Sequence, residues 1–96
     1  TADQVKKLVI AYEPIWAIGS GKTPTIKEIE SAVKAIRKVI EDDFSKKASE
    51  TIAVVYGGSI DSKNASSIIK TKGLDGLLIG GACLNADNMA QILRQV

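Results

Sequence analysis

The sequence predicts an α/β fold in which three strands alternate with three helices along a chain of 96 residues. Three short apolar runs predict the strands, and a segment with helical spacing or helix-start signals follows each of them. No linker or low-complexity stretch interrupts the alternation, so the pairs form one continuous piece. Such alternation is typical of parallel strands joined by right-handed crossovers.

The first strand is predicted at residues 8–12, whose unbroken apolar run is typical of a strand covered on both faces. The next helix is predicted to begin near Thr25, because Thr25 and Glu28 have the spacing of a capping box. Pro24 supports this start, since the residue before a proline avoids helical geometry. A polar tail at residues 41–50 then leads to the second apolar run. One apolar stripe lies along this helix: Ile29, Ala32, Val33, Ile36, Val39 and Ile40.

The second strand is predicted at residues 52–56 and leads through a turn into a short helix. Asp61 is the expected cap of that helix, with Ile60 and Ala65 spaced as a hydrophobic staple across it. Gly73 fits the left-handed position that ends a helix.

The third strand is predicted at residues 76–79, and the last helix is predicted to start at Asn85, with Leu84 and Met89 as its staple. Gly-Gly pairs follow both the second and the third strand, so two adjacent turns would bring backbone N–H groups to the same rim of the sheet. The last helix is expected to bury Met89, Ile92, Leu93 and Val96.

Glu13 is the candidate catalytic residue, because it stands at the carboxyl end of the first strand, where α/β proteins place their chemistry. An isolated glutamate there is usually a solvated loop acid. The connection after it, however, is apolar for a water-facing loop, which favours a lid that excludes water from a substrate. The alternative is an ordinary connection whose glycines only make turns. The candidate lid residues are Pro14, Ile15, Trp16, Ala17, Ile18, Gly19, Ser20, Gly21, Lys22, Thr23 and Pro24.

Gly21, Lys22 and Thr23 imitate the end of a nucleotide-binding phosphate loop. That motif needs a glycine five residues before Gly21, where this chain has Trp16. Without that glycine the loop cannot wrap a triphosphate, so the sequence argues against a nucleotide site.

Ser59, Gly80 and Gly81 are the candidate phosphate-binding residues. The plain structural interpretation is two tight turns. Backbone N–H groups gathered at helix N-termini can also bind a phosphate dianion through the helix dipole, without any lysine.

Three stretches, in this order, resemble the triosephosphate isomerases: AYEPIWAIGSGKTPT at residues 11–25, YGGS at residues 56–59 and LIGGA at residues 78–82. The resemblance runs nearly end to end, but it matches only the last part of that enzyme, from its sixth strand to its last helix. It implies that residues 1–96 are the C-terminal part of a single TIM (β/α)8-barrel domain, which needs roughly 250 residues in full.

The resemblance implies the chemistry as well. Glu13 would be the base that interconverts dihydroxyacetone phosphate and glyceraldehyde 3-phosphate through an enediol or enediolate, in glycolysis, with no metal and no organic cofactor. The N–H groups of Gly19, Ser59, Gly80 and Gly81 would bind the substrate phosphate, and the connection at residues 14–24 would be the lid.

Two further implications concern the framework and the lid. Arg37 and Asp75 match a structural salt bridge of the family. Pro24 is a departure, because it has no N–H to receive the hydroxyl of Tyr56 when the lid shuts. We therefore expect closure to depend on Ser59 bonding near Gly21.

The chain lacks part of the machinery that the resemblance implies. It has no histidine, whereas the family polarises the carbonyl with one. We expect the segment alone to be inactive and to self-associate, and its partners to be the triose phosphate and the N-terminal part of the barrel, in a homodimeric parent. The alternatives are a non-catalytic barrel fragment and a phosphate-binding folding unit.

The composition of the chain bears on its partners and on its cellular location. A net charge of +2 and four aromatic residues argue against nucleic acid as a partner. No apolar run approaches the roughly 18 residues of a membrane helix, and a single cysteine suits a reducing compartment, the cytoplasm. The start without methionine suggests a truncated or processed segment.

Overall fold

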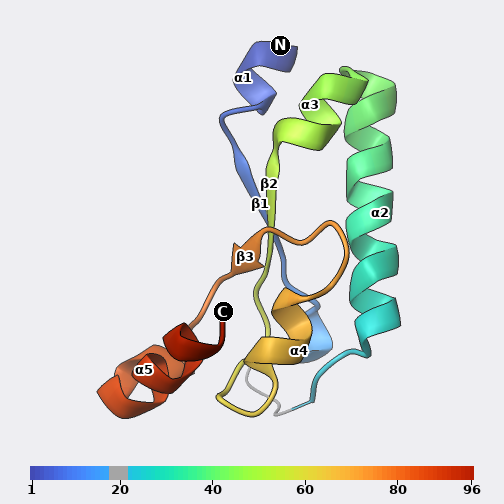
Figure 1. Ribbon diagram of the computed structural model, residues 1–96. Helices are drawn as coiled ribbons and strands as arrows, with labels where there is room; N and C mark the ends of the chain where they lie inside the picture. Colours follow the sequence, from blue (N-terminus) through green and yellow to red (C-terminus); the bar gives the residue numbers. More distant parts are fainter. Residues whose placement is uncertain (18–21) are drawn as a thin grey trace.

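The computed structural model describes residues 1–17 and 22–96, with the side chains of Ala82 and Cys83 also outside the description (Figure 1). All strands in this part pair in parallel, in one sheet of order β1-β2-β3. This confirms the predicted α/β class with three parallel strands, a partial (β/α)8 barrel. The elements are α1 (Ala2–Val5), β1 (Val9–Tyr12), η1 (Ile15–Ala17), α2 (Ile26–Asp43), α3 (Lys46–Thr51), β2 (Ala53–Tyr56), α4 (Ala65–Ile69), β3 (Gly76–Leu77), η2 (Gly81–Leu84) and α5 (Ala86–Gln95).

The register aligns the carboxyl ends of the three strands. Tyr12 pairs with Tyr56, and Tyr56 pairs with Leu77. The ladder continues one step further, since the N–H of Gly57 donates to the Tyr12 carbonyl at 2.9 Å and the N–H of Leu78 donates to the Tyr56 carbonyl at 2.8 Å. The residues that follow the three strands therefore lie at the same level of the sheet.

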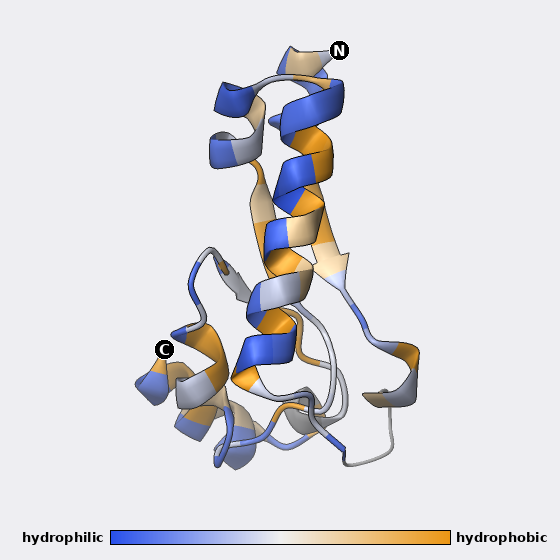
Figure 2. Cartoon of the chain, turned by 90° about the vertical axis from the view of Figure 1, so that its right-hand side faces the viewer, coloured by the Kyte–Doolittle hydropathy of each residue, from blue (hydrophilic) through white to orange (hydrophobic). Residues whose placement is uncertain are grey.

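Helix α2 begins where the sequence predicts. The N–H of Glu28 donates to Thr25 Oγ1 at 3.1 Å, and the Thr25 N–H donates to Glu28 Oε1 at 3.0 Å. Ile29, Val33 and Ile40 are buried in the core between this helix and the sheet. Val39 is 58% exposed, so the predicted stripe is wrong at that position. Figure 2, which views the molecule from the α2 side, shows hydrophilic segments recurring along this helix.

Replacing Thr25 with alanine is expected to lower the free energy of unfolding by about 1 kcal/mol, because the N–H of Glu28 loses its capping oxygen. Urea denaturation followed by circular dichroism measures this. Thr25→Ser keeps the oxygen and is the control. Equal stability of the alanine variant and the parent chain would contradict a stabilising cap.

The polar stretch at residues 41–50 contains helical structure for which the sequence analysis gives no prediction. Helix α2 continues to Asp43, and a further helix, α3, follows. Ser45 caps α3 by accepting the N–H of Ala48 at 3.0 Å, and Ala48 is fully buried. The N–H of Ile52 closes this helix on the Ala48 carbonyl, so β2 starts at Ala53, one residue later than predicted.

The connection between β2 and β3 differs in detail from its prediction. The carboxylate of Asp61 accepts the N–H groups of Lys63 and Asn64 at 2.7 and 2.9 Å, but this turn precedes α4, which begins only at Ala65. Gly73 has a φ of 86°, which confirms the predicted left-handed conformation. Because α4 already ends at Ile69, this glycine turns the loop rather than the helix.

The last unit is less buried than predicted. Strand β3 ends at Leu77, two residues before the predicted end at residue 79. Asn85 caps α5 as predicted, accepting the N–H groups of Asp87 and Asn88. Only Ile92 of the helix is buried, whereas Leu93 is 59% and Val96 is 56% exposed, so the predicted burial of those two is wrong. The physical reason is that α5 packs mainly on α4 and η2 rather than on the sheet, and Leu93 and Val96 line an open hollow of about 350 Å³ beside β3.

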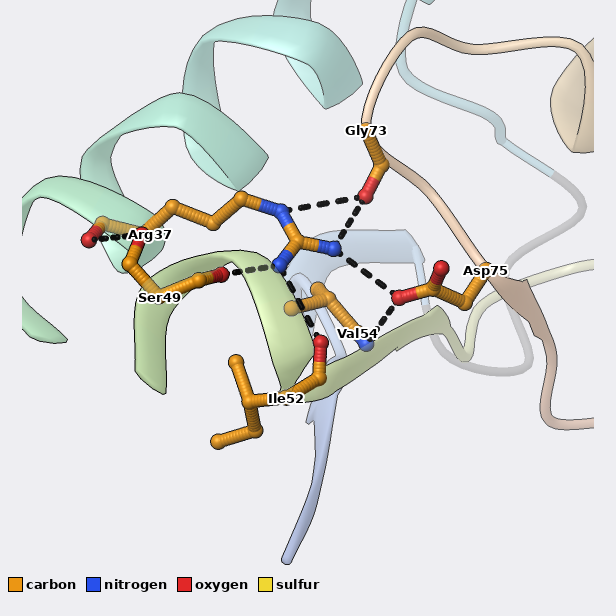
Figure 3. A network of polar contacts seen from close by, with 6 residues as sticks. All are labelled: Arg37, Ser49, Ile52, Val54, Gly73 and Asp75. Carbon is orange, nitrogen blue, oxygen red and sulfur yellow. Dashed lines mark hydrogen bonds and ion pairs between the residues drawn. The ribbon is translucent and has the colours of Figure 1, made fainter. Parts of the chain in front are cut away.

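The predicted pair between Arg37 and Asp75 is confirmed, with Nη2 at 2.9 Å from Oδ2 (Figure 3). The same guanidinium donates to the carbonyls of Gly73, Ser49 and Ile52. The Asp75 carboxylate also accepts the N–H of Val54 at 2.9 Å. One side chain of α2 thus joins α3, the start of β2 and the loop before β3.

Candidate functional site

A hollow of about 340 Å³ opens where the three strands end. It brings together three of the predicted site residues, Glu13, Gly80 and Gly81, although they are far apart in the sequence. Its lining residues are Glu13, Gly57, Gly58, Leu78, Ile79, Gly80 and Gly81. The predicted convergence of one carboxylate and the turn after the third strand is thus present in this chain.

The side chain of Glu13 lies across Gly57. A Cβ added to Gly57 would stand 2.9 Å from Glu13 Cγ and 3.0 Å from Oε1, closer than side chains tolerate. Gly57 is itself fixed by its N–H bond to the Tyr12 carbonyl. Gly57 therefore forms the floor on which the carboxylate rests, a role that the sequence analysis did not assign. The register of β1 and β2 was the signal that could have identified it.

Gly80 and Gly81 face open space. Apart from its chain neighbours, a Cβ on either residue would meet no atom of the described residues within 4 Å. Neither has a positive φ; among the glycines in the described ranges, only Gly73 does. Neither steric crowding nor backbone conformation within this chain therefore requires glycine here. The bare backbone leaves room for a group from outside the chain to approach it.

Ser59 does not line the hollow. Its hydroxyl donates to the carbonyl of Ala17 at 2.6 Å, which attaches the turn after β2 to η1. The expected bond between Ser59 and Gly21 falls outside the described residues. Ile18, Gly19, Ser20 and Gly21 lie there too, so the structure says nothing of the predicted phosphate contact of Gly19.

The described ends of the candidate lid combine anchored and exposed residues. Pro14, Ala17 and Pro24 are buried. Ile15 is 87% exposed, and Trp16 is 49% exposed. The connection at residues 14–24 is therefore held at both ends while two apolar side chains face solvent.

Tyr56 is fully buried beneath the turn, and its hydroxyl has no hydrogen-bond partner in the part of the chain that the structure describes. The hydroxyl packs on Gly58, where a Cβ would overlap it. The ring lies 6.2 Å from that of Tyr12. Burial raises the pKa of the Tyr56 phenol above its ordinary value of 10.0, and the neighbouring Tyr12 adds to the rise.

Tyr56→Phe is expected to leave the free energy of unfolding at pH 7 unchanged or to raise it by about 1 kcal/mol, since it removes an unpaired buried hydroxyl. It should also reduce the loss of stability above pH 10. There the unfolded chain releases the phenolic proton while the folded chain keeps it, so stability falls as the pH rises. Urea denaturation at several pH values measures both effects, with Tyr12→Phe as the control. A clear loss of stability at pH 7 would show that the hydroxyl has a partner.

The described residues give no support for a metal site or a membrane-spanning helix. In the described ranges, no three His, Cys, Asp or Glu side chains gather in a metal-binding arrangement. No helix there is both long enough and apolar enough to cross a bilayer.

Comparison with known proteins identifies the family of the chain. The family model described as triosephosphate isomerase matches residues 1–96. Similar curated relatives, each named triosephosphate isomerase, include those of Malacoplasma penetrans (44% identical over 94% of this chain and 36% of the relative), Geotalea uraniireducens (44%, over 98% and 38%) and Borreliella burgdorferi (45%, over 96% and 36%). The chain spans about a third of the length of these relatives. Because the family model matches it from end to end, the chain belongs to the triosephosphate isomerase family.

Proposed function

We propose that the chain supplies the last three strand-helix units of a triosephosphate isomerase barrel. In the complete barrel it would interconvert dihydroxyacetone phosphate and glyceraldehyde 3-phosphate. The observation that carries this proposal is the shared hollow, in which the Glu13 carboxylate and the open backbone of Gly80 and Gly81 face the same space.

Glu13 is the base in this proposal. Its carboxylate removes a proton from the carbon next to the substrate carbonyl and returns it to the neighbouring carbon, through an enediol or enediolate. Gly57 sets the path of the side chain, since the glutamate lies against its α-carbon. One carboxylate serves both steps because the two carbons are adjacent.

The substrate phosphate is held by backbone N–H groups of Gly19, Ser59, Gly80 and Gly81. In barrels of this kind, phosphates bind at the loops after the last two strands. The absence of side chains at positions 80 and 81 allows phosphate oxygens to approach the backbone. The connection at residues 14–24 covers the substrate and excludes water.

The chain requires the rest of the barrel for this activity. It has no histidine to polarise the carbonyl. Val9 is 63% exposed and Ala11 is also exposed, so one face of β1 is open, contrary to the coverage on both faces that its apolar run predicts. We infer that the N-terminal part of the barrel covers this face, that the parent is a cytoplasmic homodimer, and that the chain alone self-associates and is inactive.

The test combines the chain with the complementary N-terminal part of the barrel, as a second chain or as a fusion, and follows triose phosphate interconversion. Activity that appears only when both parts are present supports the proposal. Glu13→Gln is the inactive control. A reassembled, cooperatively folded barrel without activity would refute the proposed function. A Glu13→Gln variant as active as the parent would refute the assignment of the base.

A second candidate is a folding unit that binds phosphate without turnover, because Gly80 and Gly81 lie in this chain with open space before them. Titration of the chain with glycerol phosphate tests it. Measurable binding in the absence of the N-terminal part supports this candidate, and binding that requires the whole barrel refutes it.

A further inference from the structure

Two hydrogen bonds join the ends of the connection at residues 14–24 to a single turn. At the first end, the Ser59 hydroxyl donates to the Ala17 carbonyl at 2.6 Å. At the second end, Asn64 Nδ2 reaches Thr23 Oγ1 at 3.4 Å. The link between them is the bond from Asn64 Nδ2 to the Ser59 carbonyl, at 2.9 Å. The side-chain amide of Asn64 is therefore linked to both ends of the connection. It contacts Thr23 directly, and it is linked to Ala17 through Ser59.

The Asn64 side chain is itself held in place. Its Oδ1 accepts the N–H of Asp61 at 2.9 Å, while the backbone N–H of Asn64 donates to Asp61 Oδ1 at 2.9 Å. Asp61 and Asn64 thus form a reciprocal pair that fixes the turn before α4. An amide in a fixed position can hold a partner well, because little conformational freedom is lost when the bond forms.

We propose that Asn64 is a positioning residue for the reaction proposed above, and the inference rests on that proposed function. Through Ser59 it holds the carbonyl of Ala17, the last residue of η1, which follows Glu13 and Pro14 directly. Through Thr23 it holds the other end of the connection. Asn64 does not line the hollow, so in this proposal it acts by fixing these two ends.

The expected consequence is a change of geometry at the base. If η1 shifts, Glu13 shifts with it, because only Pro14 separates them. A displacement on the order of 1 Å at a catalytic group can lower a rate by up to about 100-fold. Loss of one of several contacts that hold η1 is expected to lower kcat by about tenfold.

The test uses Asn64→Ala and Thr23→Val in the reassembled barrel, with Asn88→Ala, at an exposed position on α5, as the matched control. Thr23→Val keeps the shape of its side chain and leaves the turn at Asp61 untouched, so it stays informative even where Asn64→Ala impairs folding. We expect kcat to fall about tenfold in Asn64→Ala and a few-fold in Thr23→Val. The double variant should be no worse than Asn64→Ala alone, because both changes break the same contact.

A second measurement does not depend on activity. Trypsin cleaves after Lys22, next to Thr23, and the rate of this cut reports how firmly the second end is held. We expect both variants to be cut several-fold faster than the parent and Asn88→Ala to be cut at the parent rate. Additive effects on kcat, or unchanged cleavage in both variants, would overturn the inference. Failure of the proposed function is recognised separately, by the absence of triose phosphate interconversion in the folded, reassembled parent barrel.

Discussion

Replacing Arg37 with methionine is expected to lower the free energy of unfolding by about 3 kcal/mol. The guanidinium donates to three backbone carbonyls and to the Asp75 carboxylate, and its side chain is only 19% exposed. Methionine fills a similar volume but leaves those acceptors without their donor. Urea denaturation at a fixed protein concentration measures the loss.

Two controls separate this network from an ordinary ion pair. Lys34→Met removes a surface pair with Glu30, whose side chains are 69% and 32% exposed, and is expected to cost about 0.5 kcal/mol or less. Arg37→Lys keeps the charge but cannot bond all four acceptors at once, so its loss should lie between the two. If Arg37→Met costs no more than Lys34→Met, the network does not stabilise the fold.

The elements that the sequence predicts correctly are those with local signals. The capping box at Thr25 and Glu28, the cap at Asn85 and the left-handed glycine at Gly73 are each recognisable within a few residues. The three apolar runs locate the strands to within one or two residues. These features depend on neighbours along the chain and therefore need no knowledge of the tertiary structure.

The predictions from sequence fail at positions where tertiary contacts determine which residues are buried or helical. Residues 46–51 look like a polar tail, but Ala48 is buried against the core and Ser45 caps the helix. Leu93 and Val96 have the spacing of a buried stripe, yet they are more than half exposed, because they border an open hollow beside β3 instead of a packed surface. A sequence pattern shows which side chains can be buried but not whether their partner belongs to the same chain.

The same difference between local sequence signals and tertiary contacts applies to the candidate site. Glu13, Gly80 and Gly81 were predicted from the sequence, and they line one hollow. The sequence predicts a turn at Gly57 and gives no signal for a role of Asn64. Both act through contacts across the sheet or across the loop, so neither role leaves a pattern in the local sequence.

Glu13→Gln in the reassembled barrel is expected to lower kcat by at least about 100-fold, because the amide cannot accept the substrate proton. KM should change little, since the proposed phosphate contacts come from other residues. The interconversion of triose phosphates measured across a range of substrate concentrations separates the two constants. A large rise in KM with an unchanged kcat would mean that Glu13 binds substrate rather than moving its proton.

Gly57→Ala tests the same carboxylate without altering its chemistry. The new Cβ would stand 2.9 Å from Glu13 Cγ and 3.3 Å from Leu78 Cβ, so the glutamate must move off the floor of the hollow. A kcat loss approaching that of Glu13→Gln is expected if the position of the carboxylate matters as much as its presence. Gly76→Ala is the matched control, because its Cβ would meet only Val55 Cγ1, at 3.3 Å. Equal activity of the two alanine variants, in barrels of equal stability, would show that the base works from elsewhere than the position it occupies in this structure.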